Sequence, residues 1–246
     1  MRFTAASTRD TIYYLGYMLR HHGRVFFSRW GDGEVIATRM EETGHHSPSE
    51  ALKDELIEAL SITDDLYLKA GVINYPIEYG MHLRLFKYRK TEMQKMRQYV
   101  ADITDDRFFW NAVAFHYLSI HDPMFLRRFV DEYIKPKKKM YIGSNRKEKM
   151  EAFYGPIEYY IKTPAMDAYS TIDTWWPVVL EDVDKCSLVL PSVGVASNVV
   201  IKRLWNLGVN THCIDFGSIN DALDGRKSRS WIKKIGVRKL RKKLLN

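Results

Sequence analysis

Short apolar runs alternate with amphipathic segments along most of this 246-residue chain, and the alternation restricts the folds that it can adopt. Apolar residues at helical spacing predict helices, and compact apolar runs predict buried strands. Strands that alternate with helices pair in parallel, so we predict an α/β fold with a mostly parallel sheet flanked by helices. The predicted helices span residues 8–22, 49–60, 91–101, 122–133 and 196–206, and the predicted strands 24–28, 66–73, 140–142, 159–161, 187–190 and 211–215.

Several predicted strands run directly into loops that contain glycine, proline or polar residues. Such loops follow the strands that end at Ser28, Ile142 and Ile161. The last strand–helix–strand unit, residues 187–215, ends at Asp215. Because Rossmann-like parallel sheets bind ligands outside the carboxyl ends of their strands, we expect the functional residues at this edge.

The composition is that of an ordinary globular protein. Hydrophobic residues make up 46% and charged residues 28%, and the length suits one large domain. No stretch approaches the roughly 20 apolar residues of a membrane span and the opening residues form no apolar leader, so we expect neither secretion nor membrane spanning. Cys186 and Cys213 lie among apolar, strand-like residues, which predicts two buried free thiols in a reducing, cytoplasmic compartment.

The positive charge is concentrated at the C-terminus. Residues 225–246 contain ten Lys or Arg and no Asp or Glu, so of the net charge of +8 this segment carries +10 and residues 1–224 carry −2. We therefore divide the chain into a single α/β domain, 1–224, and a basic tail, 225–246. The cations of the tail are Arg226, Lys227, Arg229, Lys233, Lys234, Arg238, Lys239, Arg241, Lys242 and Lys243.

The tail is also amphipathic, because its cations alternate with Trp231, Ile232, Leu240 and Leu244. This pattern is typical of peripheral attachment to an anionic membrane, which we expect to be the inner face, where a lipid-linked glycan acceptor would be presented. The alternatives are a solvated terminal helix and nucleic-acid binding through phosphate neutralisation. The slightly acidic domain disfavours nucleic acid as the partner of the whole protein.

The segment Arg29-Trp30-Gly31-Asp32-Gly33-Glu34 carries the clearest chemical signal. The two carboxylates can face one point, while the backbone at the glycines approaches a ligand closely. Mg²⁺ and Mn²⁺ take one or two carboxylates with water and substrate phosphate, and such an ion offsets the charge of a diphosphate leaving group. Arg29 would add a fixed positive charge. The alternative is a turn with solvated carboxylates.

Other motifs indicate no function. The sequence lacks a phosphate-binding loop, a dinucleotide fingerprint, His-Glu-x-x-His, Gly-x-Ser-x-Gly and Cys-x-x-Cys, which disfavours ATPases, dehydrogenases, zinc enzymes and serine hydrolases. Adjacent side chains diverge, so we assign surface or capping roles to the pairs His21-His22 and His45-His46. Trp175-Trp176 could stack against the base or sugar ring of a ligand, but we favour a place in the core for them.

A strand that runs into Arg29-x-Gly31-Asp32-Gly33-Glu34 resembles the opening motif of the GT-D fold glycosyltransferases, which use an Asp-x-Glu pair to hold a metal against a nucleotide sugar. Later segments agree in order and spacing. Ile142-Gly143-Ser144-Asn145 resembles the family's glycine-containing loop, residues 163–169 resemble a segment that helps to hold the nucleotide, and residues 190–218 resemble the closing βαβ unit with its Asp-x-Gly end. This chain has Asp167 where many relatives have Asn, and Ser218 where His is common.

The resemblance implies transfer of a hexose from a nucleotide sugar, which we expect to be UDP-linked, to a hydroxyl of a glycan or glycoconjugate. Asp32 and Glu34 would bind Mn²⁺ or Mg²⁺ and the diphosphate. Asp215 would be an acceptor-side carboxylate or general base, with a strand-end cap as the alternative. The residues implied in binding the donor are Arg29, Gly31, Gly33, Gly143, Asn145, Asp167, Ala168, Ser192 and Gly194, the last two before a helix start that can bind phosphate.

Two other classes of protein would use the same features. A metal-dependent phosphohydrolase or nucleotidyltransferase would use the same two carboxylates, and a nucleic-acid-binding protein would use the tail. A water-accessible site with a second carboxylate cluster would favour hydrolysis, whereas a dry nucleotide pocket facing an acceptor groove would favour transfer.

Overall fold

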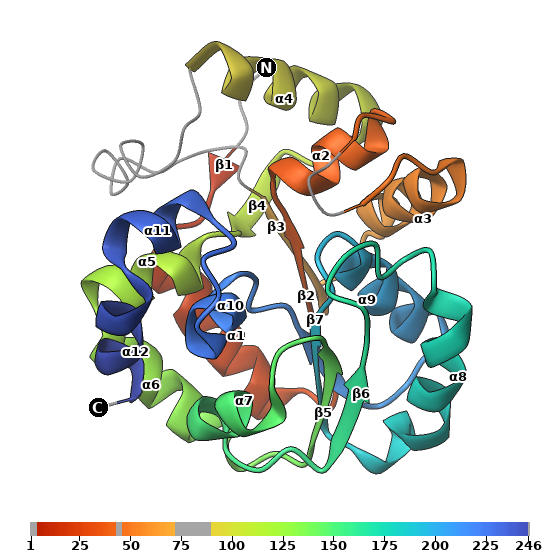
Figure 1. Cartoon of the computed structure of the whole chain (residues 1–246). Coiled ribbons are helices and arrows are strands. Elements are labelled where there is room, and N and C mark those ends of the chain that lie inside the picture. Colours follow the sequence, from red (N-terminus) through yellow and green to blue (C-terminus); the bar gives the residue numbers. More distant parts are fainter. Residues whose placement is uncertain (1–3, 43–45, 72–89, 246) are drawn as a thin grey trace.

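A computed structural model of the chain describes residues 4–42, 46–71 and 90–245. These residues form an eight-stranded sheet with the order β1-β4-β3-β2-β8-β7-β5-β6, and neighbouring strands pair in parallel throughout. Helices cover both faces of the sheet (Figure 1). The predicted α/β class with a parallel sheet is therefore confirmed.

The strands are β1 (Thr4–Ala5), β2 (Phe26–Trp30), β3 (Tyr67–Gly71), β4 (Phe108–Asn111), β5 (Lys139–Gly143), β6 (Tyr159–Lys162), β7 (Leu188–Ser192) and β8 (His212–Ile214). The central strand β2 pairs along its whole length with β3 and near its start with β8. The pairing with β3 includes Arg29 and Trp30, so β2 ends two residues later than the predicted strand 24–28. The last two residues of the predicted strand 66–73 lie outside the described part of the chain.

The helices are α1 (Thr8–His21), α2 (Asp32–Thr38), α3 (Glu50–Ser61), α4 (Lys90–Ile103), α5 (Ala114–His121), α6 (Pro123–Phe129, continued by a π-helical turn Val130–Ile134), α7 (Lys147–Tyr154), α8 (Ile172–Asp182), α9 (Ala196–Asn206), α10 (Ile219–Asp224), α11 (Ser230–Ile235) and α12 (Val237–Leu245). Helices α1, α3, α4, α6 and α9 confirm the predicted ones. The Ser7 hydroxyl caps α1 by accepting a hydrogen bond of 3.0 Å from the Asp10 N–H, and Asp122 caps α6 in the same way.

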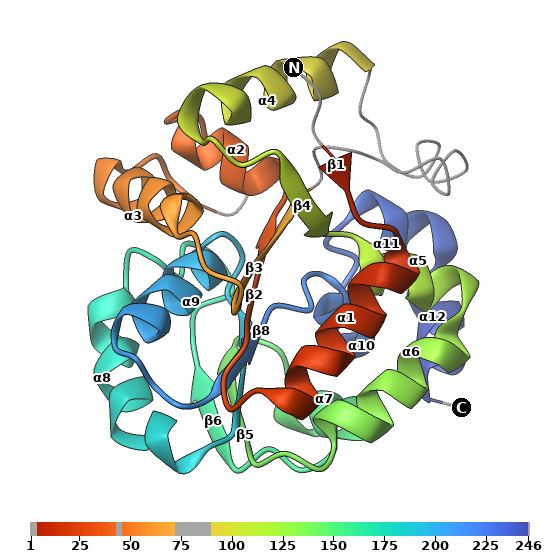
Figure 2. The same ribbon diagram turned by 180° about the vertical axis from the view of Figure 1, so that it is seen from behind.

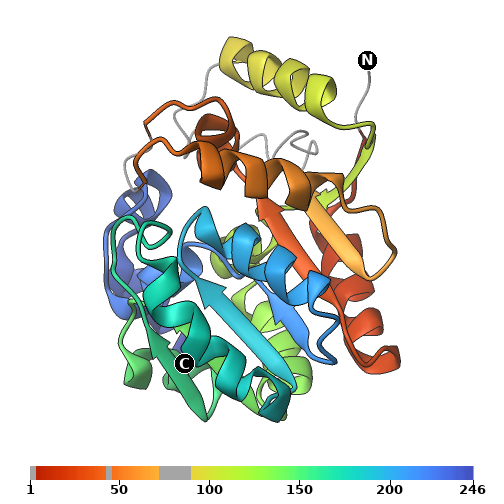
Figure 3. The same ribbon diagram turned by 90° about the vertical axis from the view of Figure 1, so that its right-hand side faces the viewer.

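The two faces of the sheet carry separate hydrophobic clusters. Successive residues of a strand point to opposite faces, so Phe26 packs in the cluster under α3, α8 and α9, and Phe27 in the cluster under α1, α5, α6 and α7. Figures 2 and 3 show these helical layers, with α2 and α4 beyond the carboxyl ends of the strands. Cys186 and Cys213 are buried and free, as predicted.

The C-terminal segment packs against the rest of the protein. Residues 230–245 form α11 and α12, and α12 contacts α5, α6, α7 and α10. Trp231, Ile232 and Leu240 are buried in a third apolar cluster. The apolar residues that make the segment amphipathic therefore face the protein interior. None of the described helices has the length and apolar character needed to cross a membrane.

His212 in β8 gives the fold a predicted pH dependence. Burial, together with the positive charges of Lys137 and His22, lowers the pKa of His212 from 6.5 to about 4. The unfolded chain binds a proton that the folded protein excludes, so this contribution to stability is complete above pH 6.5 and is lost as the pH falls toward 4. Between pH 7 and pH 5 we expect the wild type to lose about 2 kcal/mol more free energy of unfolding than His212→Phe, as measured by urea denaturation. Equal losses in the two proteins would contradict this assignment.

Candidate active site

The predicted site residues lie in the last residues of β2, β5 and β7 or in the segments that follow β2, β5, β6, β7 and β8, all at the carboxyl edge of the sheet. After β2 the chain builds β3 and β4 on one side, whereas β8, β7, β5 and β6 lie on the other. The end of β2 is therefore a point where the strand order changes direction, which is where open parallel sheets bind ligands. Figure 1 shows β2 in the middle of the sheet, with α2 beyond its end.

The Asp-x-Glu segment begins a helix, which corrects the predicted loop. Gly31 is the N-cap of α2, and Asp32, Gly33 and Glu34 form its first turn. Glu34 stabilises this start, because its Oε2 accepts a hydrogen bond of 2.6 Å from the Gly31 N–H. Both carboxylates thus lie where the helix dipole favours negative charge.

Glu34 is buried close to two other carboxylates. Its pKa is raised to about 7, first by burial and then by the charges of Asp32 and Asp215, against the opposing effect of backbone hydrogen bonds. The charges of Asp32 and Asp215 therefore repel a negative charge on Glu34. A cation bound by Asp32 and Glu34 would relieve this repulsion.

The two glycines of the segment are needed for contacts inside the protein. A Cβ atom at Gly33 would lie 3.2 Å from Val195 Cγ1, so glycine lets the first turn of α2 pack against the start of α9. A Cβ atom at Gly31 would lie 3.1 Å from Glu34 Oε2. Val195 and the Glu34 carboxylate therefore lie close to the backbone of these two glycines.

Asn198 fixes α9 to the end of β2. Its side-chain NH₂ group donates a hydrogen bond of 2.9 Å to the Arg29 carbonyl, and its side-chain oxygen accepts one of 2.8 Å from the Ser28 hydroxyl. These bonds hold the last residues of β2 against the start of α9, and so they set where α2 begins.

Arg29 and Asp215 form a buried ion pair between the ends of β2 and β8. Arg29 Nη1 lies 3.5 Å from Asp215 Oδ2, and Arg29 Nε donates to the Ala112 carbonyl at 2.5 Å. Asp215 Oδ1 accepts a hydrogen bond of 2.6 Å from the Gly217 N–H. Burial raises the pKa of Asp215, while Arg29 and the Gly217 N–H lower it. A Cβ atom at Gly217 would lie 1.7 Å from Arg29 Nη1, so only glycine lets the guanidinium cross this turn.

Asn145 holds the loop after β5 together. Its Oδ1 accepts hydrogen bonds from the hydroxyls of Tyr141 at 2.7 Å and Ser192 at 3.1 Å, and its Nδ2 donates to Asp221 at 3.2 Å. There is also little space for a side chain at Gly143, because a Cβ atom there would lie 3.0 Å from the Ser192 carbonyl oxygen. The structure thus brings Gly143, Asn145 and Ser192 together, and the Asn145 side chain is bound by protein groups.

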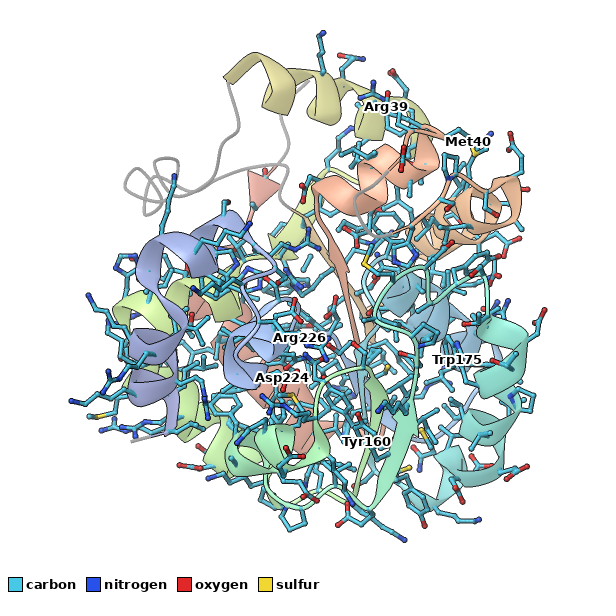
Figure 4. The ribbon with its side chains drawn as sticks, viewed as in Figure 1. Arg39, Met40, Tyr160, Trp175, Asp224 and Arg226 are labelled. Carbon is cyan, nitrogen blue, oxygen red and sulfur yellow. The ribbon has the colours of Figure 1, made fainter. Side chains whose placement is uncertain are left out.

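Two arginines bind the buried carboxylate of Asp224 beside this loop. Arg146 Nε and Arg226 Nε each lie 2.7 Å from an Asp224 oxygen. Arg226 also donates to the Ser144 hydroxyl at 2.7 Å and to the Ser144 carbonyl at 2.5 Å. Figure 4 shows Asp224 and Arg226 side by side. The beginning of the basic segment is therefore fastened to the loop after β5.

His46 joins two loops that are predicted to hold the nucleotide. Its Nδ1 lies 3.7 Å from Asp167 Oδ1, and its Nε2 lies 2.8 Å from where a Cβ atom of Gly194 would be. Gly194 has φ +64° and Asp167 φ +50°, so both loops pass through left-handed backbone beside the histidine. The side chain of His46 is buried, so the predicted surface role is wrong for it, and His45 lies outside the described residues.

Ala168, next to Asp167, is part of the hydrophobic core. Its side chain is buried, and its carbonyl accepts a hydrogen bond of 3.2 Å from Trp175 Nε1. Trp175 is itself buried among the residues that cover one face of the sheet (Figure 4). The core role predicted for Trp175 is therefore confirmed.

Ser218, the residue after Asp215-Phe216-Gly217, links α5, α10 and α11. Ser218 Oγ accepts a hydrogen bond of 3.0 Å from Trp231 Nε1 and lies 3.4 Å from His116 Nε2. The rings of His116 and Trp231 stack with centroids 5.1 Å apart. His116 is absent from the predicted site residues, because α5 is buried on most sides and shows no amphipathic pattern.

Comparison with known proteins identifies the class of fold. No protein-family model matches the chain, and no curated protein matches it. Among solved structures, it shares its fold with a protein described as "A New Glycosyltransferase (DUF1792) from Streptococcus sanguinis", with a TM-score of 0.71, 15% identity, and coverage of 89% of this chain and 83% of that chain. A structure described as "The highly conserved domain of unknown function 1792 has a distinct glycosyltransferase fold" matches with a TM-score of 0.64, 14% identity, and coverage of 89% of this chain and 80% of that chain. The chain therefore has a glycosyltransferase-like fold.

Substitution of Arg29 tests the ion pair. Arg29→Met leaves the buried Asp215 carboxylate without its counter-charge, so we expect the free energy of unfolding at pH 7 to fall by about 3 kcal/mol. Adding Asp215→Asn removes the uncompensated charge, so the double variant should recover part of that loss. Urea denaturation of the wild type, both single variants and the double variant gives the coupling energy. Strictly additive effects would show that the two side chains do not interact.

Substitution of Gly194 tests the packing of His46. We expect Gly194→Ala to destabilise the protein more than the matched control Gly208→Ala, which has a similar φ of +68° but would make only an ordinary 3.8 Å contact with Arg24. The control carries backbone strain of roughly 1 kcal/mol, whereas Gly194→Ala must also displace His46. In a His46→Ala background the difference between the two alanine variants should vanish. Thermal unfolding measures all of these variants, and equal losses in the wild-type background would argue against the contact.

Proposed function

We propose that this protein is a metal-dependent glycosyltransferase that moves a hexose from a UDP-linked sugar to a hydroxyl of a glycan or glycoconjugate. The observation that carries the proposal is the position of Asp32 and Glu34, which begin a helix directly after the central strand of the sheet. The fold is shared with a solved protein described as a glycosyltransferase. Fold and acidic pair together favour this reaction over others that a parallel sheet can support.

The acidic pair suits a hard divalent cation. Mn²⁺ and Mg²⁺ bind carboxylate oxygens together with water and phosphate oxygens. Glu34 can keep α2 capped through Oε2 and offer Oε1 to the ion. Within the described residues no group of three or more His, Cys, Asp or Glu forms a metal site, so the remaining ligands would be water and the substrate diphosphate. When bound, such an ion offsets the charge that grows on the diphosphate as the glycosidic bond breaks.

The loops after β5, β6 and β7 are proposed to hold the nucleotide. Ser192 and Gly194 precede α9, whose first N–H groups can bind phosphate. The side chain of Asp167 is 36% exposed and can reach a ribose or base. The side chains of Asn145 and Ala168 are buried against protein groups, so these residues would act by holding the loops in place.

For Asp215, the contacts favour the strand-end cap over the general base. One carboxylate oxygen accepts from the Gly217 N–H and the other pairs with Arg29. We therefore propose that Asp215 positions Arg29 and the turn after β8. Its negative charge also contributes to the raised pKa of Glu34.

The phosphohydrolase or nucleotidyltransferase alternative would use the same acidic pair. A second carboxylate cluster would favour it, and the described part of the chain contains no acidic cluster of metal-binding size. The nucleic-acid alternative would use the basic segment, residues 225–246, and would leave the carboxylates of Asp32, Glu34 and Asp215 without a role. The acidic pair therefore favours transfer over nucleic-acid binding.

Calorimetric titration of UDP and UDP-hexoses tests the proposed function. We expect UDP to bind in the presence of Mn²⁺ and to bind at least about tenfold more weakly without it. Asp32→Asn combined with Glu34→Gln should abolish this dependence on metal. The glutamine side chain at this second position still offers an oxygen to the Gly31 N–H, so the start of α2 is retained.

The matched control is Glu41→Gln combined with Glu42→Gln, which makes the same change in charge on exposed residues after α2. This variant should bind UDP as the wild type does. The proposal fails if neither UDP nor any UDP-hexose binds with Mn²⁺, or if the Asp32→Asn, Glu34→Gln variant keeps metal-dependent binding. Rapid hydrolysis of a nucleotide substrate in the absence of acceptor would favour the hydrolase alternative.

A further inference from the structure

Helices α11 and α12 lie on one flank of the domain (Figures 1 and 2). Together with the segment before them, they carry many exposed cations. Residues 225–246 contain no Asp or Glu, so the segment cannot neutralise its own charge. The exposed cations are Lys227, Arg229, Lys233, Lys234, Arg238, Lys239 and Lys242.

Packing fixes the direction in which these cations point. Leu240 and Leu244 of α12 are buried against the domain. At 3.6 residues per turn, Arg238, Lys239 and Lys242 lie on the opposite side of α12 and share one face. The exposed positions of all three agree with this geometry.

Helix α6 extends this surface and adds apolar side chains. The lining of a pocket between α6, α7 and α12 includes Met124, Leu245, Arg127 and Arg128, together with Asp131, which is paired with Lys135 at 2.6 Å. Met124 is 53% exposed, so apolar atoms are accessible among the cations of α6 and α12. We call the exposed cations of residues 227–242, with Arg127, Arg128, Met124 and Leu245, the cationic face.

We propose that the cationic face binds the protein to an anionic lipid surface. Anionic headgroups match its positive charge, and Met124 and Leu245 can contact the hydrocarbon directly beneath the headgroups. A single-stranded nucleic acid would be held by stacking on exposed aromatic side chains as well as by cations. Trp231, the aromatic residue of α11 and α12, is buried, so the observations favour lipid over nucleic acid.

The cationic face adjoins the candidate active site. Trp231 of α11 donates its hydrogen bond to Ser218, the N-cap of α10 in the loop after β8. The α11 end of the cationic face is therefore the part nearest the loop after β8, and a membrane bound there would place a lipid-linked acceptor next to that loop. This link to the acceptor rests on the proposed function, whereas lipid binding itself does not.

Co-sedimentation with vesicles tests the proposal on the full chain without any substrate. We expect binding to vesicles in which about one third of the lipid is phosphatidylglycerol and the rest is phosphatidylcholine. Vesicles of phosphatidylcholine alone should bind little protein. Arg238→Glu, Lys239→Glu and Lys242→Glu combined should lower the partition coefficient for the anionic vesicles by roughly a hundredfold. Thermal unfolding and metal-dependent UDP binding should stay as in the wild type, which separates this proposal from the proposed function.

The matched control combines Lys95→Glu, Lys138→Glu and Lys185→Glu, which makes the same change in net charge at exposed positions away from α11 and α12. It should keep wild-type binding to anionic vesicles. Equal sedimentation with both kinds of vesicle, or unchanged binding of the Arg238, Lys239 and Lys242 variant, would overturn the proposal. Tight binding of an oligonucleotide without binding to anionic vesicles would assign the face to nucleic acid and would likewise overturn it.

Discussion

The ion pair of Arg29 and Asp215 connects the ends of the two central strands, and the geometry of the candidate site depends on it. One guanidinium group contacts the Asp215 carboxylate and the Ala112 carbonyl and crosses the turn at Gly217. It therefore holds β2, the segment before α5 and the turn after β8 at once. A buried ion pair is retained only where its remaining hydrogen-bonding groups are satisfied, and the Ala112 carbonyl and the Gly217 N–H supply those partners. Because Asp215 is fixed here, its charge acts on Glu34 and contributes to the raised pKa of that residue.

The negative charge of this edge explains why a cation would be needed for the proposed reaction. Burial is the largest cause of the raised pKa of Glu34, which is about 7, and the charges of Asp32 and Asp215 add to it, while Arg29 lowers the pKa of Asp215. The cation of β2, Arg29, is paired with Asp215. A nucleotide diphosphate at the first turn of α2 would therefore meet the carboxylates of Asp32 and Glu34. The helix dipole at this position attracts anions, but its partial charge is smaller than that of two carboxylates. A divalent ion bound there, as proposed, would reverse the sign of the local field, so the same two residues would hold a diphosphate that they would otherwise repel.

The sequence pattern predicts the layers of this fold well and the contacts between distant residues poorly. Alternation of apolar runs predicts the parallel sheet, because that periodicity reflects which side of each element is buried. It misses α5, which is buried on most sides, and β1, which has only two residues. It also misses the strand β4 and the helices α7, α8 and α10. It places Gly31 to Glu34 in a loop, because glycine disfavours helices, whereas the Glu34 cap and the packing of Gly33 against Val195 override that preference. Pairs such as Arg29 with Asp215, or His46 with Asp167, are separated by long stretches of chain, so spacing carries no signal for them.

An amphipathic basic segment can bury its apolar side either in a membrane or in its own protein, and the sequence alone does not distinguish the two. In this chain Trp231, Ile232, Leu240 and Leu244 are buried in the domain, so the segment meets any partner mainly with its cations. Charge-based attachment is screened by salt over a Debye length of about 8 Å at physiological ionic strength, whereas attachment through a buried apolar face is not. Such attachment is reversible. Reversible attachment would suit the proposed enzyme, because it would have to take a water-soluble nucleotide sugar from solution and still reach an acceptor at a lipid surface.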